Sequence, residues 1–332
     1  MVRPEPHDRG PADIVSVDSA GAAMRAGRHV TSLAHGATAS WLEGGRLFLQ
    51  HGPINLIVRT GGSTPAVADA YRALIDVFPA WLGALVEELP RLRSPESPRL
   101  ALPAGSIARR MVGAVRTCAG AFVTPMAAVA GSVADEATAV LAAQPGIEHA
   151  YVNNGGDIAL HLEPGARLSV GVVPTLREAI PRARIEIASD SEVRGVATSG
   201  WQGRSLSLGI ADAVTVLARS AAAADAAATL IANAVDVDHP AIRREPARAL
   251  DEDSDLGDLP VTVAVPALDA EAIDAALDAG VATARALSKR GVVEGAALTL
   301  QGRWRVLENN GAGLHDAGAR MDTRSRHPGE RA

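Results

Sequence analysis

Residues 196–235 read VATSGWQGRSLSLGIADAVTVLARSAAAADAAATLIANAV. This stretch predicts a loop rich in serine and glycine, then a short β-strand, then an alanine helix. On that helix Asp225, Thr229 and Asn233 follow one another at intervals of four residues. Because such positions advance by only about 40° per step, the three polar side chains share one stripe. The remaining small residues let the helix lie close to a sheet, so we expect the fold to be organised around it.

The polar stripe has two interpretations. The carboxylate of Asp225 and the hydroxyl of Thr229 can offer two oxygen ligands to a hard cation such as Mg²⁺, which would need further oxygens from elsewhere. Polar residues at positions i and i+4 are also typical of the solvent face of a surface helix. Spacing alone leaves both interpretations open.

Composition is that of an ordered globular protein. Of the 332 residues, 47% are hydrophobic and 21% are charged, which is close to the average for such proteins. The net charge is −6 and aromatic residues make up only 3%, so we expect no nucleic-acid partner. No apolar run is long enough for a membrane span, which needs about 18 or more residues.

Cysteine content and the first residues bear on the compartment. Cys118 is the only cysteine, which excludes an intramolecular disulfide and a thiolate zinc cluster. Acids and prolines stand where a secretory signal would need an apolar core. We therefore expect a cytoplasmic protein, and its oligomeric state is not predicted.

Strand and helix patterns occur in blocks, without regular βα alternation. This order favours an α+β fold with mixed sheets and packed alanine-rich helices over a doubly wound sheet. We expect one domain over 13–310, with a charged, irregular surface insertion at about 236–259 and flexible tails at 1–12 and 311–332. The predicted strands include 13–18, 46–50 and 54–60, and the predicted helices include 65–78, 107–118, 126–143 and 269–287.

Glycines at two places in the chain suggest close contacts. Asn153–Gly156 joins two alternating β-type runs, which predicts a hairpin turn. The same turn can let backbone N–H groups of Gly155 and Gly156 approach a phosphate or ribose, with Asn154 beside them and Asp157 accepting from a hydroxyl or ordering the turn. Gly131 costs its helix about 1 kcal/mol relative to alanine, which suggests a packing or ligand reason.

Four segments, in this order, resemble the ApbE family, the flavin transferases that move FMN from FAD onto a protein Ser or Thr. AVAGSVADEATAVL resembles the family's small-residue helix, with Gly131 and Asp135 at the family spacing and Ala130 where the family has lysine. NNGGD resembles its GGD turn, and Thr198-Ser199-Gly200 resembles its SG strand end. The last segment resembles its Asp-x-x-x-Thr helix, so the resemblance implies that Asp225 and Thr229 help bind magnesium beside FAD.

A closer resemblance is to uncharacterised protein family 0280, a branch of the ApbE-like superfamily. Signature blocks similar to those of that family stand at 125–136, 154–158, 198–218, 224–235 and 292–302. The resemblance spans roughly 14–306 and implies an ApbE-like fold. That branch carries no activity that can be transferred to this chain.

One departure from the ApbE pattern concerns the chemistry. The transferases carry a His-Ile-x-Asp-Pro-like segment before the strand that precedes the metal helix, and residues 204–212 contain no histidine. Transfer needs a base for the acceptor hydroxyl, and Asp212 is the remaining local candidate, although it also reads as an acid that starts a strand. Ser205 and Ser207 suit hydrogen bonds to a ligand, although exposed loop serines are commoner.

These observations predict a protein that binds a flavin (FAD or FMN) or a related nucleotide diphosphate together with Mg²⁺, with an FMN or nucleotidyl-type transferase as the candidate activity. The alternative is a non-catalytic flavin-binding, carrier or accessory protein, which the missing histidine favours. The predicted cation ligands are Asp225 and Thr229, and the candidate base is Asp212. The predicted ligand-binding residues are Asn154, Gly155, Gly156, Asp157, Thr198, Ser199, Gly200, Ser205 and Ser207.

Overall fold

The computed structural model describes residues 14–15, 30–118, 122–176, 183–308 and 314–316. The tails expected at 1–12 and 311–332 therefore lie outside the described residues, apart from a short strand at 314–316. Of the strand expected at 13–18, only Ile14–Val15 is described.

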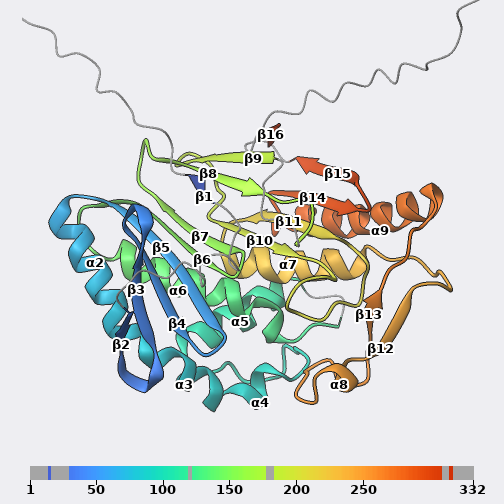
Figure 1. Ribbon diagram of the computed structural model, residues 1–332, viewed down its shortest axis with the longest axis horizontal. Helices are drawn as coiled ribbons and strands as arrows, with labels where there is room; N and C mark the ends of the chain where they lie inside the picture. The colour runs from blue at the N-terminus through green and yellow to red at the C-terminus, as the bar shows by residue number, and fades with distance from the viewer. Residues whose placement is uncertain (1–13, 16–29, 119–121, 177–182, 309–313, 317–332) are drawn as a thin grey trace, which may run out of the picture.

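A large antiparallel sheet runs through the molecule (Figure 1). Its ten strands follow the order β15-β14-β11-β10-β7-β6-β5-β4-β3-β2, and each neighbouring pair is antiparallel. The strands are β2 (Val30–Ser32), β3 (Thr38–Leu42), β4 (Arg46–His51), β5 (Ile54–Gly62), β6 (Ile147–Asn154), β7 (Asp157–Leu162), β10 (Gly195–Ser199), β11 (Ala213–Ala218), β14 (Gly295–Leu300) and β15 (Arg303–Glu308). Because β6 ends at Asn154 and β7 begins at Asp157, the predicted hairpin at Asn153–Gly156 is confirmed.

Two smaller sheets accompany the large one. A four-stranded sheet has the order β1-β8-β9-β16, in which β1 and β8 are parallel. A two-stranded sheet joins β12 to β13. The bounds are β1 (Ile14–Val15), β8 (Arg167–Val172), β9 (Ala183–Ala188), β16 (Leu314–Asp316), β12 (Arg243–Pro246) and β13 (Pro260–Ala264).

The helices match most of the predicted positions. The predicted helix at 126–143 is a 3₁₀ turn over Pro125–Ala128 followed by α6. The helices are α2 (Thr64–Val77), α3 (Trp81–Glu87), α4 (Leu89–Leu92), α5 (Ser106–Thr117), α6 (Val129–Ala142), α7 (Ala221–Ala234), α8 (Ala247–Leu250) and α9 (Ala270–Lys289). With strands and helices grouped in blocks, the predicted α+β class is confirmed.

Side chains of alternating strand residues build two cores on the two faces of the large sheet. In β4, Leu47 and Leu49 pack with helices, whereas Phe48 packs with strands of the four-stranded sheet. This alternation follows from the two-residue period of a strand. The described part of the chain therefore forms three layers, namely helices, large sheet and small sheet (Figure 1). No helix among the described residues is long and apolar enough to cross a membrane.

Helices α6 and α7 pack against each other at very short range. A Cβ on Gly131 would lie 2.2 Å from the backbone oxygen of Ala221, so only glycine fits the contact. Each helix also caps the other: Asp135 of α6 accepts from the N–H groups of Ala221 and Ala222, both at 2.9 Å, and Asp225 of α7 accepts from the N–H of Gly131 at 3.0 Å. The N-terminal amides of both helices thus meet a carboxylate, the side chain that helix dipoles favour there.

The charged insertion at 236–259 is more ordered than the sequence suggested. The prediction of an irregular surface loop is wrong for 243–250, because β12 pairs with β13 and α8 follows β12 directly. Thr124 Oγ1 donates to Asp255, so the tip of the insertion contacts the segment that leads into α6. The insertion therefore forms a wall of the cavity described next.

Candidate ligand and cation site

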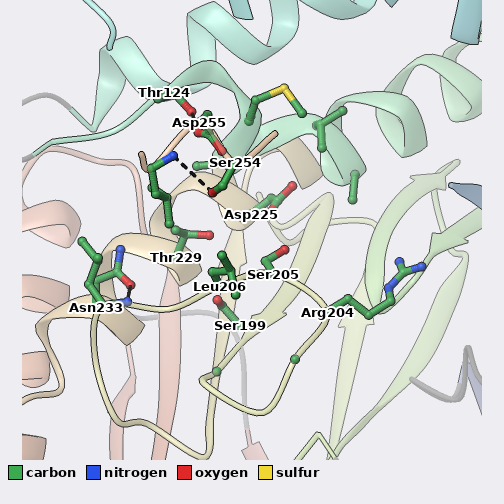
Figure 2. A pocket seen from close by; sticks show the side chains of 18 of the residues that line it. Thr124, Ser199, Arg204, Ser205, Leu206, Asp225, Thr229, Asn233, Ser254 and Asp255 are labelled. Atoms are coloured by element: carbon green, nitrogen blue, oxygen red, sulfur yellow. Dashed lines mark hydrogen bonds between the residues drawn. The ribbon is translucent and has the colours of Figure 1, made fainter. Parts of the chain in front are cut away.

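A cavity of about 560 Å³ lies where α7, the β6–β7 turn, the loop after β10 and the tip of the insertion meet. This volume falls in the range of about 300–1,000 Å³ that is typical of small-molecule sites. Figure 2 shows Asp225 and Thr229 on one side of it, with Ser199 and Ser205 near them and Ser254 and Asp255 beyond.

The polar stripe of α7 faces this cavity. Asp225, Thr229 and Asn233 all line it, and most alanines of the helix are buried in the surrounding core. The solvent-face interpretation of the stripe is therefore wrong. The helix could be recognised from its sequence, but its burial on all other sides depends on the elements that enclose it.

Asp225 is held at the start of α6. Its carboxylate accepts from the N–H of Gly131 at 3.0 Å and interacts with the N–H of Ala130. Burial raises its pKa well above the ordinary value, and the negative charge of Asp157 raises it further. An ionised carboxylate has about four lone-pair sites, so these two amides leave capacity for another partner.

Asp157 begins β7 and presents the second carboxylate. It is 9% exposed, and its Oδ1 accepts from the N–H of Thr198 at 3.3 Å. Burial raises its pKa to about 7, against the opposing influence of that hydrogen bond and of the Arg204 guanidinium. The charge of Asp157 opposes the ionisation of Asp225, and a bound cation would neutralise both carboxylates.

The protein supplies only part of a coordination sphere for a cation. Within the described residues, no group of three or more His, Cys, Asp or Glu side chains is arranged to hold a metal ion. Asp157, Asp225 and the hydroxyl of Thr229 all line the cavity and are oxygen donors. Such a set suits Mg²⁺, which commonly binds one or two carboxylates and completes its octahedron with water and ligand phosphates.

The structure brings most of the predicted ligand-binding residues to the cavity wall. Besides the aspartates, the lining includes Gly155, Thr198, Ser199, Gly200 and Ser205. Thr198 shares a hydrogen bond of 3.0 Å with Thr215, which orients its hydroxyl. Their contact with a ligand remains a prediction.

Four predicted residues lie outside the lining. Asn154 donates to the carbonyl of Ala130 at 3.1 Å, and the N–H of Gly156 donates to Asn153 at 2.9 Å within the turn. Ser207 is 4% exposed and bonds to Gly209 and Asn233, so its description as an exposed loop serine is wrong. These three residues support the walls through contacts within the protein.

Asp212 is the fourth. Its Oδ2 accepts from the N–H of Gln301 at 2.6 Å, and its Oδ1 from Trp201 Nε1 at 3.4 Å. Burial raises its pKa, and these two hydrogen bonds oppose the shift. The side chain therefore ties the loop after β10 to the β14–β15 turn. Its proposed role as a base remains a prediction, and the geometry favours the positioning role.

Several lining residues escaped the sequence analysis. The insertion contributes carboxylates to the cavity wall, although its charged, irregular composition looks like that of an ordinary surface loop. Arg204 of the loop after β10 also lines the cavity without having been predicted. The uneven charge of the insertion could have indicated Asp251, Asp253, Ser254 and Asp255, and an arginine inside a Ser-Gly loop could have indicated Arg204. Arg93 also lines the cavity, and neither of these signals covers it.

The chain belongs to the family whose model is described as AbpE bacteria, which matches residues 39–306, and to the UPF0280 proteins. A UPF0280 protein of Methanosarcina acetivorans is 31% identical over 188 residues, which cover 56% of this chain and 72% of that protein. A UPF0280 protein of Methanosphaerula palustris is 40% identical over 131 residues, which cover 39% of this chain and 53% of that protein. The chain thus spans about half the length of the latter relative. These matches confirm the family predicted from the sequence.

Among solved structures, the chain is similar to the apo form of the Pseudomonas stutzeri flavinyl transferase ApbE. The two share 13% sequence identity with a TM-score of 0.36, over 85% of this chain and 95% of that chain.

Proposed function

We propose that this UPF0280-family protein binds a flavin or related nucleotide diphosphate together with a divalent cation in the cavity beside α7. The observation that carries the proposal is a pair of carboxylates, buried Asp157 and half-buried Asp225, which line one cavity. The charge of Asp157 raises the pKa of Asp225. Ionisation of both carboxylates at neutral pH costs stability in the absence of a cation, and a bound cation would remove that cost.

The donor set favours a phosphate-bearing ligand. Two carboxylates and the Thr229 hydroxyl leave positions on the cation for ligand oxygens, as is usual where Mg²⁺ binds a nucleotide. When bound, the cation neutralises phosphate charge. Asp225 is fixed by the α6 amides, so the protein holds this oxygen in place before the ligand arrives.

The apolar residues of the cavity lining favour a ligand with a planar organic group. Small-molecule sites are mostly apolar with a few polar groups that set orientation. Several hydrophobic side chains line the same cavity as the carboxylates, and a flavin ring would pack against them. They include Phe122, Val123, Met126, Val129, Val173, Leu176 and Leu206.

Binding without group transfer is the second candidate function. Of the described residues that line the cavity none is a histidine, and Asp212, the predicted base, bonds to Gln301 and Trp201 outside the lining. Both observations favour a flavin-binding or carrier protein over a working transferase. The transferase function predicts AMP release from FAD, and the carrier function predicts none.

The test is a titration of the purified protein with FAD, with and without Mg²⁺, followed by an assay of the same samples for AMP. The informative variant is Asp225→Asn, which keeps a side-chain acceptor for the α6 amides but removes the charge. We expect it to lose Mg²⁺-dependent binding while it stays folded, because the relief of the repulsion from Asp157 offsets the weaker acceptor at the α6 amides.

The matched control is Asp76→Asn on the exposed face of α2, which should behave like the unaltered protein. Undiminished Mg²⁺-dependent binding by Asp225→Asn would remove this carboxylate from the site. Absence of FAD binding by the unaltered protein at any Mg²⁺ concentration would remove flavin from the proposed function.

A further inference from the structure

Arg204 is a cation in the cavity wall without a strong partner of its own. It is exposed, lines the cavity, and makes no side-chain hydrogen bond or ion pair within the described parts of the chain. The charge it faces is that of Asp157, whose pKa it lowers. Figure 2 shows its side chain extending on the side of the cavity opposite Asn233.

The guanidinium lies directly against the β6–β7 turn. A Cβ added to Gly155 would stand 2.1 Å from Arg204 Nη2 and 3.2 Å from Cζ. Gly155 also has φ +69°, a conformation that side-chain-bearing residues rarely adopt. The glycine therefore allows the arginine to rest on the turn at the wall of the cavity.

The loop that carries Arg204 is fixed from both ends. At one end, Asn233 Oδ1 accepts from the N–H of Leu208 at 3.0 Å and from Ser207 Oγ at 3.3 Å. At the other end, the N–H of Trp201 donates to the carbonyl of Ala211 at 3.0 Å. Little loop freedom is thus lost when a ligand meets Arg204, which favours binding.

The charges around the cavity are mostly negative. Two arginines, Arg93 and Arg204, are found among the described lining residues. Arg93 already forms an ion pair with Asp253, with 3.9 Å between Arg93 Nη1 and Asp253 Oδ1. A phosphate that enters therefore finds one uncommitted positive side chain among the described lining residues, besides any cation on the carboxylate pair. The carboxylates of the lining are Asp157, Asp225, Asp251, Asp253 and Asp255.

We propose that Arg204 binds a phosphate of the ligand beside the β6–β7 turn, so that the cavity recognises a diphosphate at two points, the cation and this guanidinium. The planar guanidinium suits phosphate oxygens, which it can bind in a bidentate manner. This inference rests on the proposed function, because the first of the two points is the cation held by Asp157 and Asp225.

Cation and phosphate binding should then support each other. With no cation bound, the negative charge of Asp157 attracts Arg204, and a bound cation cancels that charge. Arg204 is then available to the phosphate. Removal of Arg204 should therefore weaken diphosphate binding but leave the affinity for Mg²⁺ alone unchanged or higher, since a positive charge near the cation has gone.

The experiment measures binding of inorganic pyrophosphate, inorganic phosphate and FAD at saturating Mg²⁺, and binding of Mg²⁺ alone. The variants are Arg204→Gln and the control Arg285→Gln, which removes an exposed arginine on α9. We expect Arg204→Gln to weaken pyrophosphate and FAD binding about tenfold or more, the size of a lost charge-assisted hydrogen bond. Arg285→Gln should change neither.

A second variant, Gly155→Ala, moves the guanidinium without removing its charge. It should weaken pyrophosphate binding in the same direction, and it should add little in the background of Arg204→Gln, because the two changes act on one contact. Independent, additive losses would contradict this contact.

The outcomes separate this inference from the proposed function. If the unaltered protein binds pyrophosphate with Mg²⁺ and Arg204→Gln binds it equally well, the role of Arg204 is refuted while the cation site stands. Equal affinity of the unaltered protein for phosphate and pyrophosphate would refute recognition at two points. If pyrophosphate binds and FAD does not, the flavin assignment fails and the role of Arg204 is judged on pyrophosphate. If the unaltered protein binds neither pyrophosphate nor FAD in the presence of Mg²⁺, both proposals are refuted.

Discussion

The contact between α6 and α7 makes a sharp prediction for the substitution Gly131→Ala. The added Cβ would stand 2.2 Å from the carbonyl oxygen of Ala221 and 2.8 Å from the N–H nitrogen of Ala222. Both atoms are backbone, so no side chain can rotate away. The two helices would have to separate, and this would also pull the Gly131 N–H away from Asp225.

The magnitude follows from two opposing effects. Overpacking of a rigid core costs typically about 1–3 kcal/mol, and we take the upper end because backbone must move. Alanine regains about 1 kcal/mol of helix propensity relative to glycine. The net loss is about 2 kcal/mol, which corresponds to a melting temperature lower by about 3 °C for a domain of about 300 residues.

Gly113→Ala in α5 is the matched control. Gly113 is an exposed helical glycine, and an added Cβ would meet no atom within 4 Å. The control should therefore gain up to about 1 kcal/mol from propensity alone. Thermal and urea denaturation of the two variants measure the difference. If Gly131→Ala were as stable as Gly113→Ala, the close contact between the helices would be refuted.

Two further predictions concern acids at the site. Because burial raises the pKa of Asp157 from 3.8 to about 7, the folded protein binds its proton more tightly than the unfolded chain. This contribution to stability is therefore fully present below about pH 3.8 and is lost as the pH rises to about 7, so cation-free protein should lose stability over this window relative to Asp157→Asn. Saturating Mg²⁺ should reduce the loss. Identical pH profiles of stability for the unaltered protein and for Asp157→Asn would contradict this prediction. Asp212→Asn should lower stability by about 1–2 kcal/mol, since its amide nitrogen would face one of the donors Gln301 N or Trp201 Nε1. Thermal denaturation measures this loss. Normal FAD binding with loss of an AMP release that the unaltered protein shows would instead restore Asp212 as a base.

Much of the fold could be predicted because local patterns agree with the tertiary structure. The strand at 54–60 and the hairpin at Asn153–Gly156 follow from period-two alternation and turn residues, and both are found. Gly131 was expected to have a packing or ligand reason, and the contact with Ala221 supplies the packing reason. The insertion was harder, because the pairing of β12 with β13 depends on the neighbouring chain rather than on its own composition.

The site could be predicted only in part, because its key property depends on residues far apart in the sequence. The stripe on α7 was visible, but its direction was not, since helical spacing does not say what covers a face. Asp157 was expected to order a turn, and its interaction with Asp225 depends on how β7 and α7 meet at the cavity. Asp212 was chosen for its place in the sequence, whereas its partners Trp201 and Gln301 hold it outside the cavity lining.

Asp135 and Asp225 both accept from N-terminal amides of a neighbouring helix, but only Asp225 also lines the cavity. Asp135 accepts from two amides at 2.9 Å at the start of α7 and does not line the cavity. Asp225 makes the equivalent contact at the start of α6, but it also lines the cavity, where the charge of Asp157 opposes its ionisation. Helix capping alone would be served as well by a neutral asparagine, which is among the preferred capping residues. The presence of a second, opposing carboxylate at the cavity therefore favours a cation as the reason for the charge, and capping as the means that holds Asp225 in place.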